Sequence, residues 1–276
     1  MVILFSNVII PSINIITLLI TGLLCIAGLP LLFVLLRRRY QLKLVPFLVG
    51  AAGWMILVLF AESQVRNWII DPDSPFYNRM VANPALYMLV IGFGSAVIIE
   101  GGKFLIFYFM KRWYASHSAA IAFSFGFCSV DSLFLVGIRY VIYSWLTYRQ
   151  NSNLLAGAAG LDYPELFNRL AGQTPAEIVM AGIERYLYCA IIIGLTFLVW
   201  YSAVKPFRMY LLYAAGLLHA LFYAPYAMTE VHVLKIATPY YIVVTVLAVL
   251  SLFIAYLVYR AAMRYKENEP DPFTLL

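Results

Sequence analysis

The stretch Val97-Ile98-Ile99-Glu100-Gly101-Gly102-Lys103-Phe104 decides how this sequence is interpreted, because it places two charges inside an apolar run. The run covers residues 85–110 and has the length of a membrane-spanning helix. Glu100 and Lys103 lie one helical turn apart, and in hydrocarbon such charges are costly unless they face each other, a cavity or the protein interior. The two glycines between them allow another helix to approach closely. We therefore expect a polar centre inside a membrane protein.

The composition extends this interpretation to the whole chain. Of its 276 residues, 64% are hydrophobic and 12% are charged, and the mean hydropathy is +0.87. Soluble domains average about 45–50% apolar and about 25% charged residues, so the sequence predicts a single membrane domain over residues 1–276. The net charge of +6 comes mainly from basic residues beside the apolar runs and gives no indication of nucleic-acid binding. We expect an integral, multi-pass protein of a prokaryotic plasma membrane, in contact with lipid.

The apolar runs predict an all-α fold with seven transmembrane helices. The expected spans are approximately residues 15–36, 44–60, 85–110, 118–143, 175–204, 210–228 and 239–259. The first run lacks a basic leader and a clear cleavage site, so we interpret it as a retained span. Thr174-Pro175-Ala176-Glu177 is a capping box with proline at the first helical position and predicts the start of the fifth span. A short interfacial helix is expected near 163–170 and a cytoplasmic tail over 262–276.

The distribution of Lys and Arg predicts the orientation, because cytoplasmic loops are enriched in these residues. The loops after the first, third, fifth and seventh spans hold Arg37, Arg38, Arg39, Lys43, Lys111, Arg112, Lys205, Arg208, Arg260, Arg264 and Lys266. The opposite loops hold Arg66, Arg79, Arg149, Arg169 and Lys235. This bias predicts an N-terminus outside the cell and a C-terminus in the cytoplasm.

Few ionisable side chains fall within the expected spans. Apart from Glu177 in the first turn of the fifth span, they are Glu100, Lys103, Asp131, Arg139, Glu184, Arg185 and His219. At ~1.5 Å per helical residue, Glu100 and His219 lie about 15 Å into their spans, Glu184 lies about 14 Å in and Asp131 about 20 Å in. These four side chains on consecutive spans predict a shared polar centre near mid-membrane, supported by Lys103 and Arg185.

Each of these residues also has a purely structural interpretation. Glu100 and Lys103 can neutralise each other while the lysine extends toward the cytoplasm. Asp131 follows small residues suited to close helix packing and can hydrogen-bond across that contact. Arg185 can pair with Asp131 or Glu100, and an isolated intramembrane His219 can be a hydrogen-bonded core residue. The test of the functional interpretation is whether the four predicted side chains face a common interior.

The order of these motifs resembles the YhfC family of intramembrane metalloproteases. An acidic motif in one span precedes a Gly/Ser-rich span with a carboxylate, then Glu184-Arg185, then Leu217-Leu218-His219. That family belongs to a wider group with CAAX-processing proteases, PrsW-type proteases and the Aph subunit of gamma-secretase, which has a similar seven-span layout. The resemblance covers roughly residues 85–259, and it implies peptide-bond hydrolysis within the membrane.

The sequence departs from the family pattern at several positions. The family's Glu-Glu-x-x-Lys/Arg motif, whose acid would activate water, is present as Ile99-Glu100-Gly101-Gly102-Lys103 and lacks the first Glu. Phe127 stands where the next motif has a His, and the His that should follow Glu184-Arg185 is absent. His219 matches the final His, but the acid expected after it is missing, with Tyr223 nearby.

These departures affect the expected chemistry. A catalytic zinc site typically uses three protein ligands plus water, so one intramembrane His does not support a conventional His-rich zinc site. A ligand set of Glu100, Asp131, Glu184 and His219 would be unusual for zinc, and metal binding stays open. A metal-free alternative uses Glu100 as the general base and His219 to stabilise the developing oxyanion.

We therefore predict an intramembrane protease-like protein that hydrolyses or binds a transmembrane or lipidated peptide. The alternative is a catalytically inactive pseudoprotease that serves as a scaffold or subunit of a membrane complex, so whether the chain is an enzyme stays open. A retinal protein is disfavoured because residues 240–248 hold no Lys for a Schiff base. A transporter is disfavoured because no convincing internal repeat or broken helix is present.

Overall fold

The computed structural model describes residues 9–71, 73–152, 164–205, 208–230 and 238–266, and every element assigned within them is a helix. In chain order the elements are α1 (Ser12–Tyr40), α2 (Leu44–Trp54), η1 (Met55–Glu62), α3 (Ser63–Ile69), α4 (Pro75–Ala82), α5 (Pro84–Met110), α6 (His117–Ser132), η2 (Leu133–Gly137), α7 (Ile138–Asn151), α8 (Pro164–Gly172), α9 (Pro175–Val204), α10 (Met209–Glu230) and α11 (Thr238–Lys266). The segments η1 and η2 are π-helical turns within longer helices. The expected all-α fold is confirmed.

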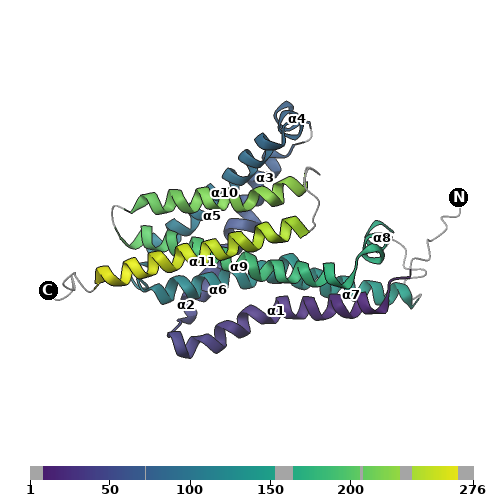
Figure 1. Cartoon of the computed structure of the whole chain (residues 1–276), viewed down its shortest axis with the longest axis horizontal. Helices are drawn as coiled ribbons and strands as arrows, with labels where there is room; N and C mark the ends of the chain where they lie inside the picture. The colour runs from purple at the N-terminus through teal and green to yellow at the C-terminus, as the bar shows by residue number, and fades with distance from the viewer. Residues whose placement is uncertain (1–8, 72, 153–163, 206–207, 231–237, 267–276) are drawn as a thin grey trace.

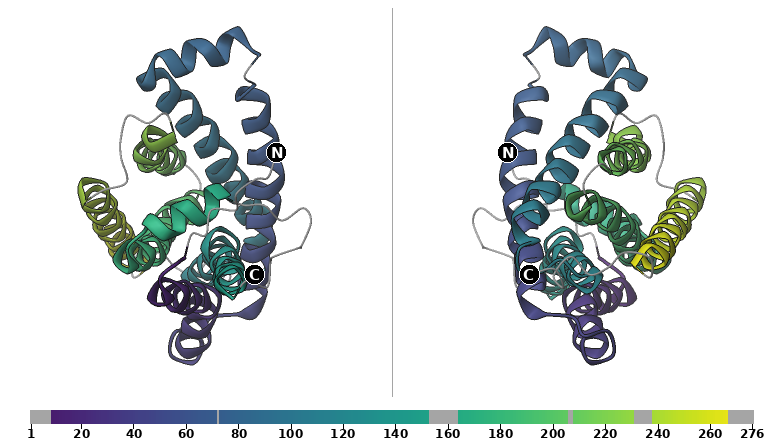
Figure 2. Two further views of the ribbon diagram at one scale, coloured as in Figure 1. Left: turned by 90° about the vertical axis from the view of Figure 1, so that its right-hand side faces the viewer. Right: turned by 90° about the vertical axis from the view of Figure 1, so that its left-hand side faces the viewer.

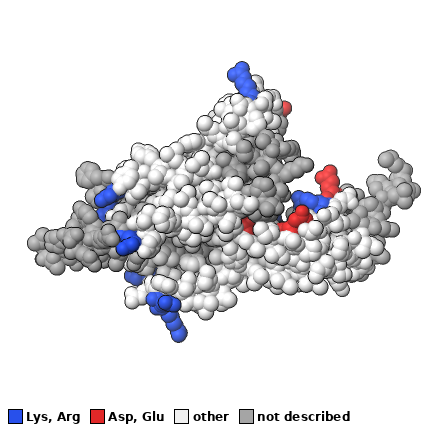
Figure 3. Space-filling view, viewed as in Figure 1, with Lys and Arg blue, Asp and Glu red and all other residues white. Residues whose placement is uncertain are grey.

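Five helical stretches are long and apolar enough to cross a membrane. They are Ser12–Tyr40, Leu44–Ile69, Pro84–Met110, His117–Asn151 and Pro175–Val204. Helices α10 and α11 contain shorter apolar stretches within their described residues, Met209–Tyr223 and Ile242–Ile254. Most of the face in Figure 3 is uncharged, and several Lys and Arg side chains gather toward its left end. The chain is an integral multi-pass membrane protein, while the seven-span count and the orientation stay predictions.

Several helices run past the limits expected from hydropathy. The second expected span was placed at 44–60, but its helix continues through η1 and α3 to Ile69, where a loop was expected. The fourth continues to Asn151, and α11 continues to Lys266, so the first residues of the expected tail are helical. Residues 267–276 of that tail lie outside the described residues. Polar residues ended the apolar runs in the sequence, but they do not end the helices.

Helix α9 forms the centre of the bundle. It contacts α1, α5, α6, α10 and α11, and α11 runs alongside it in Figure 1. Helix α10 also packs on α5, and α2 packs on α6. The α3–α4 segment projects from one side of the bundle, and α1 lies toward the opposite side in both views of Figure 2. This arrangement surrounds α9 with the elements that carry the predicted polar residues.

Glycines set the closest helix contacts. A Cβ atom at Gly50 would collide with the backbone carbonyl of Phe123, and one at Gly126 would collide with that of Phe47, so α2 and α6 meet backbone to backbone. Of the glycine pair on α5, Gly102 faces Leu57 of η1, whereas Gly101 faces open space. The close helix contact expected at the small residues of α6 is therefore confirmed. On α5 the expected contact beside Glu100 is also present, but it is made at Gly102 and not at Gly101.

The start of α9 follows the sequence signal. Thr174 accepts a hydrogen bond from the backbone N–H of Glu177, whose carboxylate accepts one from the backbone N–H of Thr174, and Pro175 takes the first helical position. This capping box satisfies backbone groups that the first helical turn leaves free. The short helix expected near 163–170 is present as α8.

Candidate functional site

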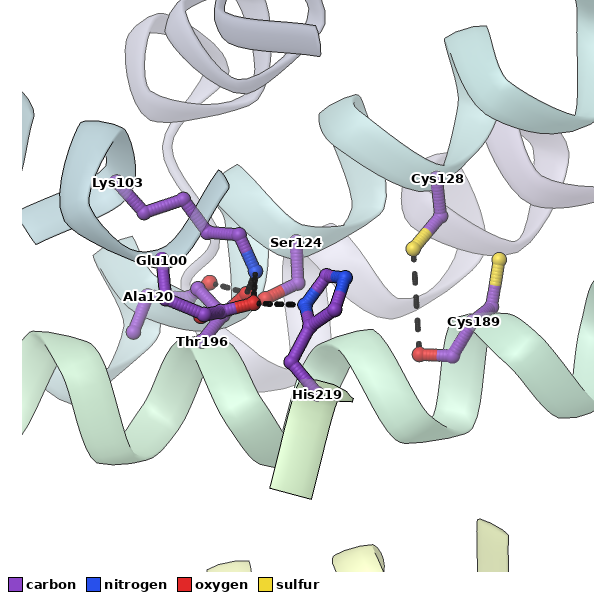
Figure 4. A network of polar contacts seen from close by, with 8 residues as sticks. All are labelled: Glu100, Lys103, Ala120, Ser124, Cys128, Cys189, Thr196 and His219. Carbon is purple, nitrogen blue, oxygen red and sulfur yellow. Dashed lines mark hydrogen bonds and ion pairs between the residues drawn. The ribbon is translucent and has the colours of Figure 1, made fainter. Parts of the chain in front are cut away.

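Glu100 and His219 meet in the interior, between α5 and α10 (Figure 4). His219 Nδ1 lies 2.7 Å from Glu100 Oε1, and Lys103 Nζ donates a hydrogen bond of 2.8 Å to the same oxygen. The relative exposure of Glu100, Lys103 and His219 is 1%, 0% and 2%. The three side chains are therefore a buried cluster in which one carboxylate oxygen contacts both a lysine and a histidine. We call it the Glu100 cluster.

Lys103 is held by groups from other helices as well. Its Nζ lies 3.4 Å from Thr196 Oγ1 on α9 and 5.3 Å from the ring centroid of Phe127 on α6. A cation over an aromatic face gains electrostatic stabilisation that increases when the pair is desolvated. The self-neutralising pair considered from the sequence is thus present, but the idea that Lys103 extends toward the cytoplasm is wrong. The lysine bends inward because Glu100, Thr196 and Phe127 together replace its hydration.

Two polar atoms of the Glu100 cluster have no hydrogen-bond partner among the described residues. They are Glu100 Oε2 and His219 Nε2, and both are inaccessible to solvent. In Figure 4 the second ring nitrogen of His219 points away from Glu100, on the side toward Cys128 and Cys189. Buried polar atoms are nearly always hydrogen-bonded in folded proteins, to protein or to water. These two atoms are therefore the polar positions of the cluster at which water or a ligand could bind.

Asp131 and Glu184 form a separate group around Arg185. Asp131 Oδ1 accepts a hydrogen bond of 2.9 Å from Trp54 Nε1, and its other oxygen lies 3.7 Å from Arg185 Nη1. Arg185 Nη2 donates a 2.7 Å hydrogen bond to Glu184 Oε1, and its guanidinium lies 5.5 Å from the ring centroid of Tyr188. We call this group the Asp131 cluster. It joins α2, α6 and α9, and it fulfils the structural interpretation in which Arg185 pairs with Asp131.

The four side chains expected to form one centre are thus divided between two clusters. Glu100 and His219 contact each other, as the sequence predicted, whereas Asp131 and Glu184 contact Arg185. Their catalytic or binding roles stay predictions.

Tyr188 on α9 lies near charged and polar residues from several helices. It interacts with Asp131 and Arg185, and also with Glu62 and Tyr223.

Sequence reasoning missed the residues near Glu62. Ser95 Oγ donates to Glu62 Oε1, and Arg66 Nη1 donates a 2.7 Å hydrogen bond to the hydroxyl of Tyr223. Hydropathy predicts a loop at Glu62 and Arg66, yet Glu62 is the last residue of η1 and Arg66 lies in α3, so the second helix continues through both. Glu62 is only 8% exposed. The sequence signal for this arrangement is the spacing of Glu62 and Arg66, which are four residues apart directly after an apolar run. In a helix that continues past the run, this spacing places both side chains on the same side.

A small groove opens between η1–α3 and α5. Its lining includes Glu62, Val65, Arg66, Ile91, Ser95 and Ile98. The wall is mostly aliphatic, and its three polar side chains supply a carboxylate, a guanidinium and a hydroxyl. It adjoins the Glu100 cluster, because Tyr223, which binds Arg66, stacks on His219 at 6.4 Å between ring centroids.

The described residues do not fit a catalytic zinc ion. Among the described residues no group of three or more His, Cys, Asp or Glu side chains is placed to hold a metal. Glu100 Oε1 is already bound by the ammonium of Lys103, a cation at the position where a metal would need that oxygen. One His and one carboxylate beside a lysine fall short of the three protein ligands that catalytic zinc uses.

The fold and this geometry define an integral multi-pass membrane protein with a buried polar centre. The model of the YhfC intramembrane metalloprotease family matches residues 21–261, and the chain belongs to this family. The uncharacterized membrane protein YhfC of Bacillus subtilis (strain 168) is 24% identical over 227 residues, which are 80% of this chain and 87% of that protein. No solved structure matches the chain. The resemblance inferred from the motifs is confirmed, and the bacterial relative supports the expected location in a prokaryotic membrane.

Proposed function

We propose that this chain is an intramembrane protease-like protein in which Glu100 and His219 are the reactive pair. The observation that carries the proposal is the contact between His219 Nδ1 and Glu100 Oε1, buried within a helical bundle of the YhfC family. The substrate is a transmembrane or lipidated peptide. Lys103 holds the carboxylate in place, and the Asp131 cluster fixes α2, α6 and α9 around it.

The chemistry assigned to the pair is metal-free hydrolysis of a peptide bond. Glu100 Oε2, which has no hydrogen-bond partner among the described residues, takes a proton from water as water attacks the peptide carbonyl. His219 Nε2 is likewise without a described partner, and it donates to the developing oxyanion when the ring is an imidazolium, because Nδ1–H is already used toward Glu100. Glu100 then passes the proton to the leaving amine. Neither step requires the ligands that a zinc site would need.

The second candidate is a pseudoprotease that binds a membrane partner without cleaving it. The observation in its favour is the ion pair between Lys103 and Glu100, because an ammonium 2.8 Å from the carboxylate makes a self-neutralised pair that needs no catalytic role. In this case the chain keeps the family fold and acts as a scaffold or subunit of a membrane complex.

One experiment distinguishes the two candidates. Membranes from cells that express the parent chain or Glu100→Gln are compared by mass spectrometry of protein termini, and proteins bound to each purified chain are identified in parallel. Hydrolysis predicts new termini in or beside transmembrane segments that require Glu100. A pseudoprotease predicts no such termini and the same bound partner with both chains. Glu177→Gln, at the exposed start of α9, is the matched control.

We further propose that α10 and α11 also cross the membrane, which makes seven spans with the N-terminus outside and the C-terminus in the cytoplasm. The support is the excess of Lys and Arg in alternate loops and the lengths of these helices, 22 and 29 residues. Reporter fusions after Lys205, after Lys235 and after Lys266 test this layout, because the first and the last are expected to report the cytoplasm and the second the outside.

A further inference from the structure

We propose that the groove between η1–α3 and α5 holds the water that serves Glu100 and His219, and that Tyr223 separates this water from the pair. The proposal rests on the proposed hydrolytic function, because hydrolysis consumes one water for each peptide bond and hydrocarbon supplies none. It names the groove as a water site and Tyr223 as a positioning residue.

The polar lining of the groove suits water better than lipid. Glu62 and Ser95 are 8% and 5% exposed, and Arg66 lines the same groove. A site that retains water needs two to four polar partners and room for at least one molecule. A carboxylate, a hydroxyl and a guanidinium within one small groove meet the first condition. An acyl chain offers no hydrogen bond to the carboxylate of Glu62, whereas water does, and a charge buried against hydrocarbon is costly.

The groove connects with the Glu100 cluster through α10. Arg66 Nη1 donates to the hydroxyl of Tyr223 at 2.7 Å, and the Tyr223 ring stacks on His219 with an interplanar angle of 20°. His219 Nδ1 in turn contacts Glu100. Tyr223 and His219 are one helical turn apart on α10, so the tyrosine occupies the position between the groove and the histidine. Its hydrogen bond to Arg66 keeps it there.

The Glu100 cluster contains atoms to which water from the groove could bind. Glu100 Oε2 and His219 Nε2 are buried and lack a hydrogen-bond partner among the described residues. Water that passes Tyr223 would satisfy both atoms and would place the reactant beside the base. Ser95 and Glu100 lie on the same helix, about 7–8 Å apart along its axis. A few water molecules would bridge that distance.

The first test measures whether the groove is aqueous, with single cysteines and a charged methanethiosulfonate that reacts only with thiolates in water. Ser95→Cys in liposomes should react at least tenfold faster than Ser124→Cys, a matched buried serine on α6. Val97→Cys, 69% exposed on α5, should remain unreactive because it faces lipid. The parent sets the background, since its three cysteines are buried. Equal rates at Ser95→Cys and Ser124→Cys, or an equally fast Val97→Cys, would overturn the water site.

The second test concerns Tyr223 and uses hydroxyl-radical footprinting of the otherwise native protein. Tyr223→Phe keeps the ring but removes the hydroxyl that Arg66 binds, so oxidation of His219 should increase severalfold over the parent. Phe123, fully buried in the core, is the internal reference and should not change. Unchanged His219 oxidation would exclude Tyr223 as the barrier.

The outcomes separate this proposal from the proposed function. Glu100-dependent cleavage with an unreactive Ser95→Cys rejects the water groove and leaves hydrolysis in place. A reactive Ser95→Cys without cleavage retains the aqueous groove and rejects hydrolysis.

Discussion

His219 Nδ1 lies 2.7 Å from Glu100 Oε1 although 119 residues separate the two side chains. The contact joins α5 to α10 in the interior, so the Leu217-Leu218-His219 motif packs against the motif that contains Glu100. Because Lys103 donates to the same oxygen, the carboxylate is shared between a histidine and a lysine. The properties of this shared oxygen, and of the helix contacts that hold it, lead to four predictions.

The Glu100–Lys103 pair should show strong energetic coupling. Glu100→Gln leaves the buried Lys103 ammonium without an opposite charge and should destabilise the protein by about 3–5 kcal/mol. Adding Lys103→Met should recover most of this loss, because the double variant buries no uncompensated lysine. Unfolding in detergent, followed by a double-mutant cycle, measures the coupling. Lys43→Met, at an exposed lysine, should change little, and additive effects of the two substitutions would contradict the prediction.

The hydrogen bond from Trp54 to Asp131 should stabilise the Asp131 cluster. Trp54→Phe removes the only donor of the indole and leaves one carboxylate oxygen without that partner, so we expect a loss of about 1.5–3 kcal/mol. The matched control is Trp68→Phe, because Trp68 is 83% exposed and Trp54 is fully buried. Thermal unfolding of both variants is the measurement. A similar, small effect of the two substitutions would show that the hydrogen bond contributes nothing.

The effect of a Gly→Ala substitution on stability should depend on what the added methyl group contacts. Gly126→Ala forces a methyl group into the Phe47 backbone, so we expect a loss of about 1–3 kcal/mol from overpacking. Gly101→Ala adds a methyl group in open space within a helix and should stabilise the protein by up to about 1 kcal/mol. Unfolding midpoints of the two variants should therefore move in opposite directions, and a shift in the same direction would refute the backbone contact.

Removal of divalent metal should leave the protein unchanged. The described residues offer no set of three metal ligands, and Lys103 already binds the carboxylate of Glu100. Dialysis against a chelator should therefore alter neither the unfolding temperature nor any Glu100-dependent cleavage. Elemental analysis of the purified chain checks this directly. Stoichiometric zinc in the parent that is lost in His219→Ala would instead show a metal site built with further ligands.

The predictable part of this structure came from local signals. The capping box gave the start of α9 to the residue, because its two hydrogen bonds lie within four consecutive residues. The contact between Glu100 and His219 was expected because charged groups inside a span need partners and few were present in the sequence. These inferences depend on short segments or on the scarcity of polar residues, and they need no knowledge of how helices rotate.

The division into two clusters was not predictable. The side to which Asp131 points depends on the rotation of α6, which is set by the backbone contacts at Gly50 and Gly126. Trp54 was absent from the expected centre because an indole in an apolar run carries no charge signal. Glu62 was assigned to a loop because hydropathy falls after residue 60, although the helix continues through the π-helical turn.

The π-helical turn η1 also affects how many residues this helix needs to cover its length. A π-helical segment winds more loosely than an α-helix, so η1 carries more residues than the same axial path in an α-helix would need. Deleting one residue within η1 would let a regular α-helix cover nearly the same path, so the side chains beyond the turn would keep approximately their present directions around the axis. Arg66 would stay beside the groove, and Trp54, which precedes the turn, would stay on Asp131. The η1 segment is therefore the place where this helix can lose a residue without turning α3 away from the interior that α2 contacts.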